Sequence, residues 1–352
     1  MFALKSRGFD SELRRYLSTV INLIMPRPNP HRPFTPNPEM VVRRPDVSGN
    51  TINGVGETEP RPPELVFWAT NPDEIAFGDV QKWFYMCQPD SPEMAKERAK
   101  RQLVLDAVLP DLNSTQAQKP GKVWTASLDQ FVEAGDCEMV GVTTLRPEWI
   151  FAGQKTDFNT VIMLGVQHDY DELKHAPEFR AGVEVVRQYG RAAAAAKNVT
   201  KWLLQQGWAA EAVTGPMAGK ILMIPPALEC GFGELGKHGS LINPEFGSSF
   251  RLAAVLTNAP FSNTPKREFG IDEFCSNCRV CEDACPPIAI EPDKQMVRGV
   301  NRWYVDFDKC IPYFAENSGC AICIVECPWS RPGVGVNLAK KLAKRSARNE
   351  AD

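Results

Sequence analysis

The residues with the clearest chemistry in this 352-residue chain are its 11 cysteines. Most of them form two groups that each close on a proline: Cys275, Cys278, Cys281 and Cys285 before Pro286, and Cys310, Cys320, Cys323 and Cys327 before Pro328. A chain of this length can bury enough surface to fold without disulfides. In a reducing compartment such a cluster therefore indicates metal ligation. The isolated cysteines are expected to be small buried hydrophobic residues: Cys87, Cys137 and Cys230.

The first group has the spacing C-x2-C-x2-C-x3-C-P, which is typical of bacterial two-cluster ferredoxins. Three closely spaced thiolates can wrap one face of a [4Fe–4S] cluster, and the fourth, carried away by a helical turn, reaches the other cluster. The second group repeats the C-x2-C-x3-C-P end, with its first cysteine displaced. The crossed pattern predicts one cluster on Cys275, Cys278, Cys281 and Cys327 and a second on Cys285, Cys310, Cys320 and Cys323. A pair of zinc sites is the alternative, but zinc motifs rarely use this spacing twice.

A glycine-rich segment, GFGELGKHGSLINPEFG at residues 231–247, precedes the cysteines. Its glycines leave a long piece of backbone that can approach a ligand closely: Gly231, Gly233, Gly236, Gly239 and Gly247. The first three match the spacing of a dinucleotide-binding loop. However, the segment does not open a clear βαβ unit, and no acidic residue is placed to hold a ribose. The nucleotide interpretation is therefore weak.

The charge balance and the hydropathy pattern exclude some classes of protein. Lys and Arg number 40 and Asp and Glu 43, which gives a net charge of −3. Proteins whose main task is to bind nucleic acid are usually strongly basic. No stretch approaches the run of about 20 apolar residues that crosses a membrane. The best candidate, residues 17–25, is short, contains polar residues and is not followed by a cleavage site for export. We expect a cytoplasmic protein.

The sequence predicts four parts. Residues 1–63 are proline-rich and are expected to form an extended arm, because proline blocks helix formation. Residues 64–264 predict an α/β or α+β domain of packed layers, with strands at 139–142, 160–166, 209–213, 221–224 and 251–257 and helices at 127–135 and 182–206. Residues 265–335 carry the cysteine groups, and the basic tail, 336–352, is a short helix at most. The aromatic run at 83–85 is either core or the wall of a ligand site.

The order of these motifs resembles a known family. The segment from residue 231 to Arg251, the TNAP sequence at 257–260, CSNCRVCEDACP and GCAICIVECPWSRPG follow one another. Together with residues 134–141 and 146–150, they look like the reductive dehalogenases, which use cobalamin and two [4Fe–4S] clusters. The resemblance covers residues 120–335. Epoxyqueuosine reductase, a relative that modifies tRNA, carries a similar glycine-rich block.

The resemblance implies a nitroreductase-like α+β domain that holds cobalamin base-off, followed by a ferredoxin-like domain. None of the four histidines, His31, His168, His175 and His238, sits in the D-x-H-x-x-G motif that ligates cobalt in another cobalamin class. The cobalt is therefore expected to have no such histidine ligand. The cofactor's polar edge is expected to meet the glycine-rich segment through Gly231, Gly233, Glu234, Gly236, Lys237, His238, Gly239 and Gly247.

The resemblance also implies a catalytic pair. The family's proton donor is a tyrosine on the long helix with a basic residue nearby, and the matching positions are Tyr189 and Arg251. A neighbouring guanidinium favours a phenolate. The expected reaction is reductive removal of halide from a halogenated organic compound, with aromatic compounds among the candidates. An external donor such as a ferredoxin or flavodoxin is expected to supply electrons.

Two other functions remain open on the sequence. The first is an enzyme like epoxyqueuosine reductase, although that family usually continues into helical repeats, whereas here 25 residues follow Cys327. The second is a non-catalytic [4Fe–4S] electron carrier whose α/β domain serves as a docking platform. The proline-rich N-terminal part resembles nothing that identifies a substrate.

Overall fold

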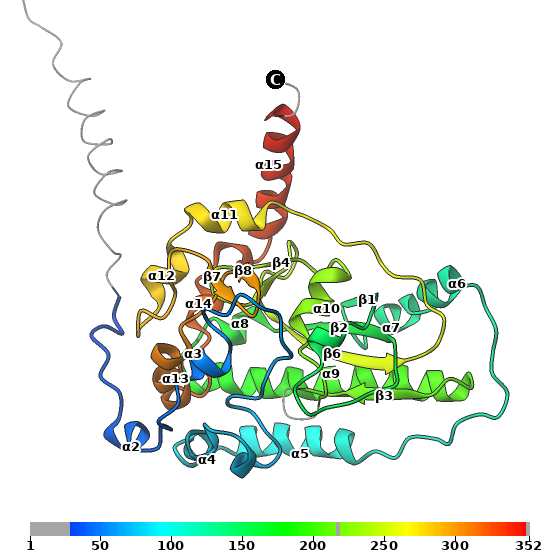
Figure 1. The fold of residues 1–352 in the computed structure, drawn as a ribbon, viewed down its shortest axis with the longest axis horizontal. Coiled ribbons are helices and arrows are strands. Elements are labelled where there is room, and N and C mark those ends of the chain that lie inside the picture. The colour runs from blue at the N-terminus through cyan, green and yellow to red at the C-terminus, as the bar shows by residue number, and fades with distance from the viewer. Residues whose placement is uncertain (1–28, 216–218, 350–352) are drawn as a thin grey trace, which may run out of the picture.

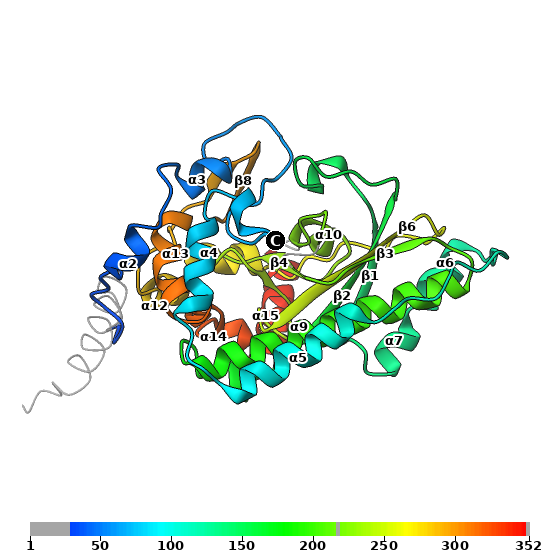
Figure 2. The same ribbon diagram turned by 90° about the horizontal axis from the view of Figure 1, so that it is seen from below.

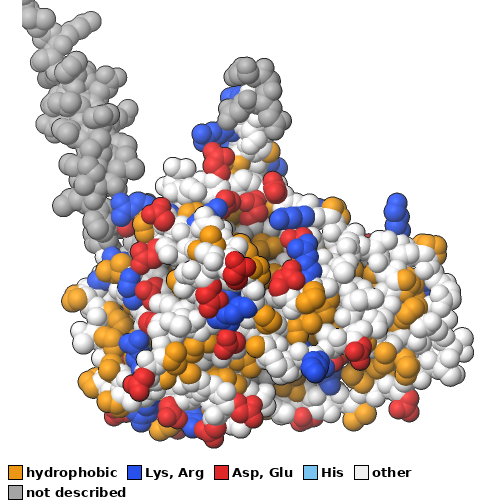
Figure 3. Space-filling model, in the orientation of Figure 1, with side chains coloured by type: hydrophobic (Ala, Val, Ile, Leu, Met, Phe, Trp, Pro, Cys, Tyr) orange, Lys and Arg blue, Asp and Glu red, His pale blue; other side chains and the backbone are white. Residues whose placement is uncertain are grey.

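The computed structural model describes residues 29–215 and 219–349 (Figure 1). The apolar stretch at residues 17–25 lies outside the described residues. Within the described part, no helix is both long enough and apolar enough to span a membrane. On the face shown in Figure 3, acidic and basic side chains are interspersed, as the nearly balanced charge leads one to expect.

The central element is a four-stranded antiparallel sheet with the order β1-β2-β6-β3. The strands are β1 (Met139–Thr144), β2 (Thr160–Gln167), β6 (Phe250–Thr257) and β3 (Ala210–Val213). Ile162 lies opposite Val255, and Met163 lies opposite Ala254. Since successive side chains point to opposite faces of a strand, β2 and β6 contribute buried residues to two separate cores. The long apolar runs in the sequence thus reflect a sheet that is covered on both faces.

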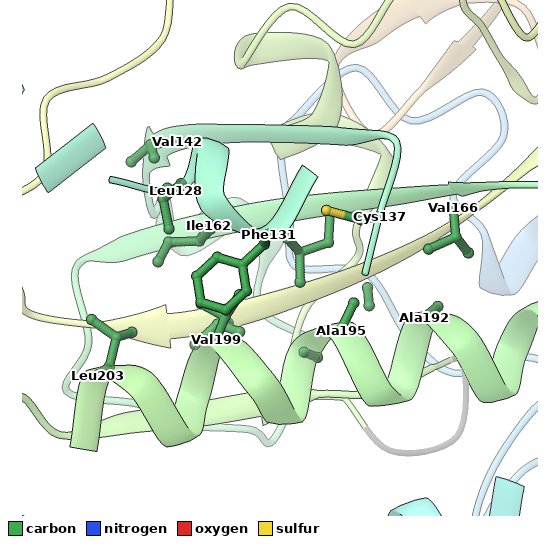
Figure 4. Close-up of a cluster of buried hydrophobic side chains, with 14 of the residues drawn as sticks. Leu128, Phe131, Cys137, Val142, Ile162, Val166, Ala192, Ala195, Val199 and Leu203 are labelled. Carbon is green, nitrogen blue, oxygen red and sulfur yellow. The ribbon is translucent and has the colours of Figure 1, made fainter. Parts of the chain in front are cut away.

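Helix α9 (Phe179–Gln205) covers one face of this sheet (Figure 4). Its small residues Ala192, Ala195 and Ala196 let it approach the strands closely, and Val199 and Leu203 continue the same buried stripe. Helix α5 (Pro92–Asp106) runs along the outer side of α9 (Figure 2). The prediction of a long helix at 182–206 with this apolar face is confirmed.

Two local predictions were wrong. Ser127 does not begin a helix but ends α6 (Gly121–Ala126), and the next helix is the short α7 (Asp129–Glu133). Residues 221–224 do not form a strand: Ile221 makes a single bridge to Ile150, and α10 (Ile224–Glu229) follows directly. Both segments carry buried apolar residues of the sheet domain, so burial alone produced the pattern that was interpreted as regular structure.

The opposite face of the sheet is covered by α10 and by the glycine-rich segment. This segment forms a small hairpin of β4 (Glu234–Leu235) and β5 (Leu241–Ile242). Phe232 and Leu241 pack with Met163 and Leu256 in the second core. The remaining short elements are η2 (Pro147–Trp149), α8 (Tyr170–Leu173), which packs on α9, and η1 (Pro72–Glu74), which packs on α4 (Gly78–Met86).

The cysteine-rich region folds from short helices and one small hairpin. Its elements are α11 (Ile271–Asn277), α12 (Val280–Ala284), β7 (Gln295–Val297), β8 (Val300–Arg302), α13 (Phe307–Glu316), α14 (Ile322–Val325) and η3 (Pro328–Ser330). The tail is a longer helix than expected, α15 (Val334–Asn349), which projects from the body in Figure 1. Its Leu338 and Leu342 pack against the core that contains Cys275 and Cys327.

The N-terminal arm packs against the cysteine-rich region. It includes α2 (Pro38–Val41) and α3 (Gly49–Ile52), and α4 (Gly78–Met86) follows. Met40 is fully buried in a core that it shares with Phe84 of α4 and Ile311 of α13. Arg32 donates hydrogen bonds of 2.6 and 3.1 Å to the carbonyl oxygen of Cys285. The arm therefore holds the end of α12 in place, where a cation also complements the helix dipole.

Backbone-to-backbone contact joins the sheet domain to the cysteine-rich region at Gly247. This residue has a φ of +59°, and a Cβ built on it would lie 2.3 Å from the Cα of Ser330. No side chain fits there without moving one of the two backbones. A second link is the buried ion pair between Lys237 and Glu282, whose Nζ and Oε1 atoms are 2.6 Å apart.

We predict that Gly247→Ala lowers the free energy of unfolding by about 2–4 kcal/mol. An alanine in the left-handed conformation is itself unfavourable, and the clash of its methyl group with Ser330 adds about 1–3 kcal/mol. Gly135→Ala is the matched control, since its φ is +77° but no atom lies within 4 Å of its Cβ position. Denaturant unfolding of both variants, in the same metal state as the parent, measures the difference. Equal losses in the two variants would contradict the steric argument.

Candidate active site and metal centres

The structure brings the eight cysteines of the two motifs into one region, where their thiols are neighbours. Burial, followed by the neighbouring thiols of Cys278, Cys327 and Cys275, raises the pKa of Cys281. Burial, followed by Cys320, Cys310 and Cys285, raises the pKa of Cys323. The two groups adjoin, because Cys281 also acts on Cys323. The crossed assignment of the thiols to two clusters stays a prediction.

The ends of short helices place most of these thiols. Cys278 ends α11, Cys285 ends α12 and Cys327 precedes η3. Cys281 lies within α12, one turn before Cys285, and the two thiols belong to different groups. In the crossed assignment, α12 and the cysteine that caps it would therefore contribute to both clusters.

The donor set suits iron–sulfur clusters. Two groups of four thiols match the ligand chemistry of two [4Fe–4S] clusters. In the part of the chain that the structure describes, no three Cys, His, Asp or Glu side chains lie close enough together to hold a single metal ion. The cost of burying thiolates is offset when they ligate metal, because metal binding displaces their protons.

Two cavities of about 410 and 500 Å³ adjoin at Trp68, Tyr189 and Arg251, which line both. The first lies against the sheet domain and includes Ser240 and Leu241 of the glycine-rich segment. The second lies between α5, α9 and the loop that joins α13 to α14.

Cys320 contributes to the wall of the second cavity. It sits in a run of four residues, Ser318–Ala321, with φ between +50° and +98°. Such left-handed conformations are costly for residues other than glycine, and they are concentrated at functional sites. The run places a cysteine of the second group at the cavity that Tyr189 also lines.

The predicted catalytic pair is brought together. The guanidinium carbon of Arg251 lies 4.7 Å from the ring centroid of Tyr189, and that of Arg101 lies 5.8 Å from the same ring. The Nε atoms of both arginines are buried without a hydrogen-bond partner among the described residues. Buried unpartnered donors beside a cavity fit a ligand with polar groups. The residues present therefore fit a cofactor or substrate with polar groups at this point.

Arg101 and His168 were missed by the sequence analysis. Arg101 comes from α5, outside every motif, and only the packing of α5 on α9 brings it to the site. His168 is 3% exposed, and neither ring nitrogen has a partner among the described residues. Burial, followed by the positive charge of Arg251, holds the pKa of His168 well below its usual range. This histidine is therefore neutral at physiological pH.

The predicted cofactor role of the glycine-rich residues stays a prediction, and the structure shows which contacts these residues make within the protein. At each predicted glycine, other atoms of the chain lie within 3.1 Å of the position that a Cβ would take. The side of the backbone on which a side chain would stand therefore faces protein: Gly231, Gly233, Gly236, Gly239 and Gly247. The carboxylate of Glu234 accepts hydrogen bonds from backbone N–H groups at the start of α11. The segment instead reaches the first cavity through Ser240 and Leu241.

Lys237 and His238 are also occupied by the protein itself. Lys237 is 2% exposed and pairs with Glu282. His238 accepts a hydrogen bond from the Ser240 N–H at Nδ1, and its Nε2 lies 3.2 Å from the Ser248 hydroxyl. Burial lowers the pKa of His238 to about 4. Both residues hold the hairpin in place, and neither lines either of the two cavities described above.

The other predicted site features have mixed outcomes. Cys137 and Cys230 are buried as expected, and burial raises the pKa of each to about 12. Cys87 is exposed, contrary to expectation. In the aromatic run, Trp83 and Phe84 are core, while Phe84 and Tyr85 also line the second cavity. Both interpretations of that run therefore hold in part.

Comparison with known proteins agrees with this arrangement. Residues 274–330 match the family model of the 4Fe-4S dicluster domain. The chain is 31% identical over 218 residues to the tetrachloroethene reductive dehalogenase of Dehalobacter restrictus. The aligned region covers 58% of this chain and 39% of that protein. It is 31% identical over 157 residues to the epoxyqueuosine reductase of a Synechococcus strain, and this aligned region covers 38% of this chain and 43% of that protein.

A solved structure shares the fold. A catabolic reductive dehalogenase in complex with 3-bromo-4-hydroxybenzoic acid superposes with a TM-score of 0.69 at 21% identity, over 86% of this chain and 46% of that chain. These findings confirm the resemblance to the reductive dehalogenases, with a mixed helix-and-strand fold and a ferredoxin-like domain. The chain spans 39% of the length of the first of these relatives.

We predict that ligand loss follows the crossed groups. Cys281→Ala and Cys327→Ala should each remove about four of about eight irons, and their double variant should lose no more, because both thiols would serve one cluster. Cys281→Ala combined with Cys285→Ala should lose nearly all iron.

Iron analysis and electron paramagnetic resonance of the reduced protein measure this loss. Cys87→Ala, which lies outside both groups, is the control and should keep its iron. Additive loss in the Cys281–Cys327 pair would refute the assignment.

Proposed function

We propose that this chain is an iron–sulfur oxidoreductase that uses cobalamin to remove halide reductively from a halogenated organic compound, R–X + 2e⁻ + H⁺ → R–H + X⁻. The observation that carries the proposal is the position of Tyr189. Two guanidinium groups lie 4.7 and 5.8 Å from its ring centroid where two cavities meet, and a cysteine of the second group is in the wall of one of them. One site thus combines a proton donor with access to electrons.

The cysteine groups suggest a direction for the electrons. Cys278 of the first group is partly exposed and has exposed neighbours at residues 276, 277 and 279. Cys320 of the second group faces the cavity. We therefore infer that electrons from an external carrier, such as a ferredoxin or flavodoxin, enter at the first cluster. They leave from the second cluster toward the cavity.

Tyr189 would supply the proton. The structure gives its hydroxyl no hydrogen-bond partner among the described residues, so the group is free to meet a substrate. Giving up the proton leaves a phenolate, which nearby positive charge stabilises. Arg251 and Arg101 bring that charge and are not paired with a carboxylate in the described part of the chain. The neutral His168 behind Arg251 adds no competing charge.

Cobalamin would be held in the first cavity, by the backbone around Ser240 and by the apolar residues Leu222, Met223 and Leu241. Bound there, it would supply the cobalt centre at which the carbon–halogen bond is reduced. None of the four histidines lines either cavity. This supports binding without a histidine ligand from the protein.

Metal analysis tests the cofactor part of the proposal. After anaerobic purification, cluster reconstitution and incubation with hydroxocobalamin, we expect about eight irons and about one cobalt per chain. The absorption spectrum is expected to be that of base-off cobalamin. Iron without cobalt would overturn the corrinoid proposal and favour an electron carrier.

Tyr189→Phe should lower turnover of a halogenated substrate by at least about 100-fold, because general acid catalysis typically contributes 10²–10⁴-fold. Iron and cobalt contents should not change, since the hydroxyl makes no bond within the described protein. Tyr170→Phe is the matched control: Tyr170 begins α8, lines neither cavity and should leave turnover intact. Halide release under reducing conditions gives the rate. Unchanged turnover in Tyr189→Phe would refute the acid role.

A further inference from the structure

The projecting helix α15 carries a local concentration of positive charge (Figure 1). Its sequence contains five basic residues and no acidic residue, although the chain as a whole has a net charge of −3. The basic residues follow one another at spacings of one and three, which places them all on one side of the helix, and each is exposed. This basic face of α15 consists of Lys340, Lys341, Lys344, Arg345 and Arg348.

A different side of α15 is fixed beside the first group of cysteines. Leu338 and Leu342 pack on the core that contains Cys275 and Cys327. The Cβ of Leu342 also lies 3.3 Å from the Cβ position of Gly270, the residue before α11. The packed side thus anchors the helix at the first group, and the basic face stands at the surface next to it.

The acidic side chains of the neighbouring helices leave most of this charge uncompensated. Each carboxylate of α11 and α12 lies close to a cation of the protein: Asp272 2.7 Å from Lys294, Glu273 3.7 Å from Arg345, Glu282 2.6 Å from Lys237 and Asp283 3.5 Å from Arg279. Arg345 is the member of the basic face that shares one of these carboxylates. The other four cations have no carboxylate partner in the part of the chain that the structure describes.

The composition of α15 suits an acidic protein better than a membrane or a nucleic acid. A helix that lies in a membrane surface needs large apolar side chains. The leucines of α15 are already packed, and beyond Leu342 its apolar residues are Ala343 and Ala347. The strongly basic balance that is typical of nucleic-acid-binding proteins is absent from the chain. Charge without apolar anchorage favours fast, specific encounters with a surface of opposite charge.

We propose that the basic face of α15 is the docking surface for an acidic electron-carrier protein, which gives up one electron to the first cluster in each encounter. This inference rests on the proposed function in one respect, the entry of electrons at the first cluster. Cys278 is partly exposed and belongs to the group beside which α15 is fixed. A carrier held on the basic face would therefore have its redox centre close to the point of entry. Opposite charges speed such encounters by about 10–10³-fold.

The test measures binding of flavodoxin, an acidic one-electron carrier, to the cluster-reconstituted protein at low and at physiological ionic strength. The parent should bind flavodoxin, and added salt should weaken binding because exposed charges are screened. Lys340→Gln, Lys341→Gln and Lys344→Gln combined should weaken binding at low salt by at least about tenfold. Reduction of the clusters by flavodoxin hydroquinone should slow by a similar factor. Reduction by the methyl viologen radical, a small cation that needs no docking surface, should not change.

The matched control combines Lys122→Gln, Lys155→Gln and Lys201→Gln, which removes three exposed charges from the sheet domain and should keep parent-like binding. Arg345 is left unchanged because it links α15 to α11. Absence of flavodoxin binding by the parent would overturn the inference, as would equal losses in the two combined variants. Parent-like binding by the α15 variant would also overturn it. Loss of binding to phosphatidylglycerol vesicles or to transfer RNA instead of flavodoxin would assign the face to another partner and have the same effect.

These measurements need neither cobalamin nor a substrate, so they separate this inference from the proposed function. Flavodoxin binding through α15, without cobalt uptake and without halide release, would sink the proposed function and uphold the docking surface. Flavodoxin-driven halide release at the same rate in the parent and in the α15 variant would do the reverse.

Discussion

The cysteine-rich region depends on the short helix α12: Cys281 lies in it, and Cys285 caps its end one turn later. Helix α12 packs against α14, and its two cysteines share a buried cluster with Cys310 and Cys323. In the crossed assignment that we predict, α12 would therefore link the two clusters. The same packing places the loop after α13, with Cys320, at the wall of the second cavity.

Contacts from distant parts of the chain keep that region against the sheet domain. Arg32 of the arm binds the last carbonyl groups of α12, and Gly247 allows the glycine-rich segment to touch Ser330. The Lys237–Glu282 pair adds a buried link, which is favourable only with good geometry because both charges lose water. Within the glycine-rich segment, Gly247 and Gly239 thus lie where two parts of the protein touch, whereas Gly233 and Gly236 pack within their own hairpin.

Charge at the junction of the cavities is positive and largely uncompensated. Tyr189 lies beneath two guanidinium groups, and the nearest histidine is buried and neutral. Such an arrangement favours negative charge, whether on a phenolate or on a bound ligand. Trp68, Phe84 and Phe314 line the second cavity beside these groups. The chemistry that we propose for the site uses this positive charge.

The sequence by itself determined the features that depend on local spacing and periodicity. These are the two cysteine motifs, the strands β1, β2, β3 and β6 and the long helix with Ala192, Ala196, Val199 and Leu203 on its buried stripe, whereas Tyr189 is only half-buried. Spacing fixes which thiols one short helix can present, and a 3.6-residue period fixes which face is buried. Only the tertiary structure decided that the glycines face protein, that Lys237 and His238 are occupied, and that Arg101 joins Tyr189. Those outcomes depend on which distant segments meet, and side chains brought together by packing leave no pattern along the chain.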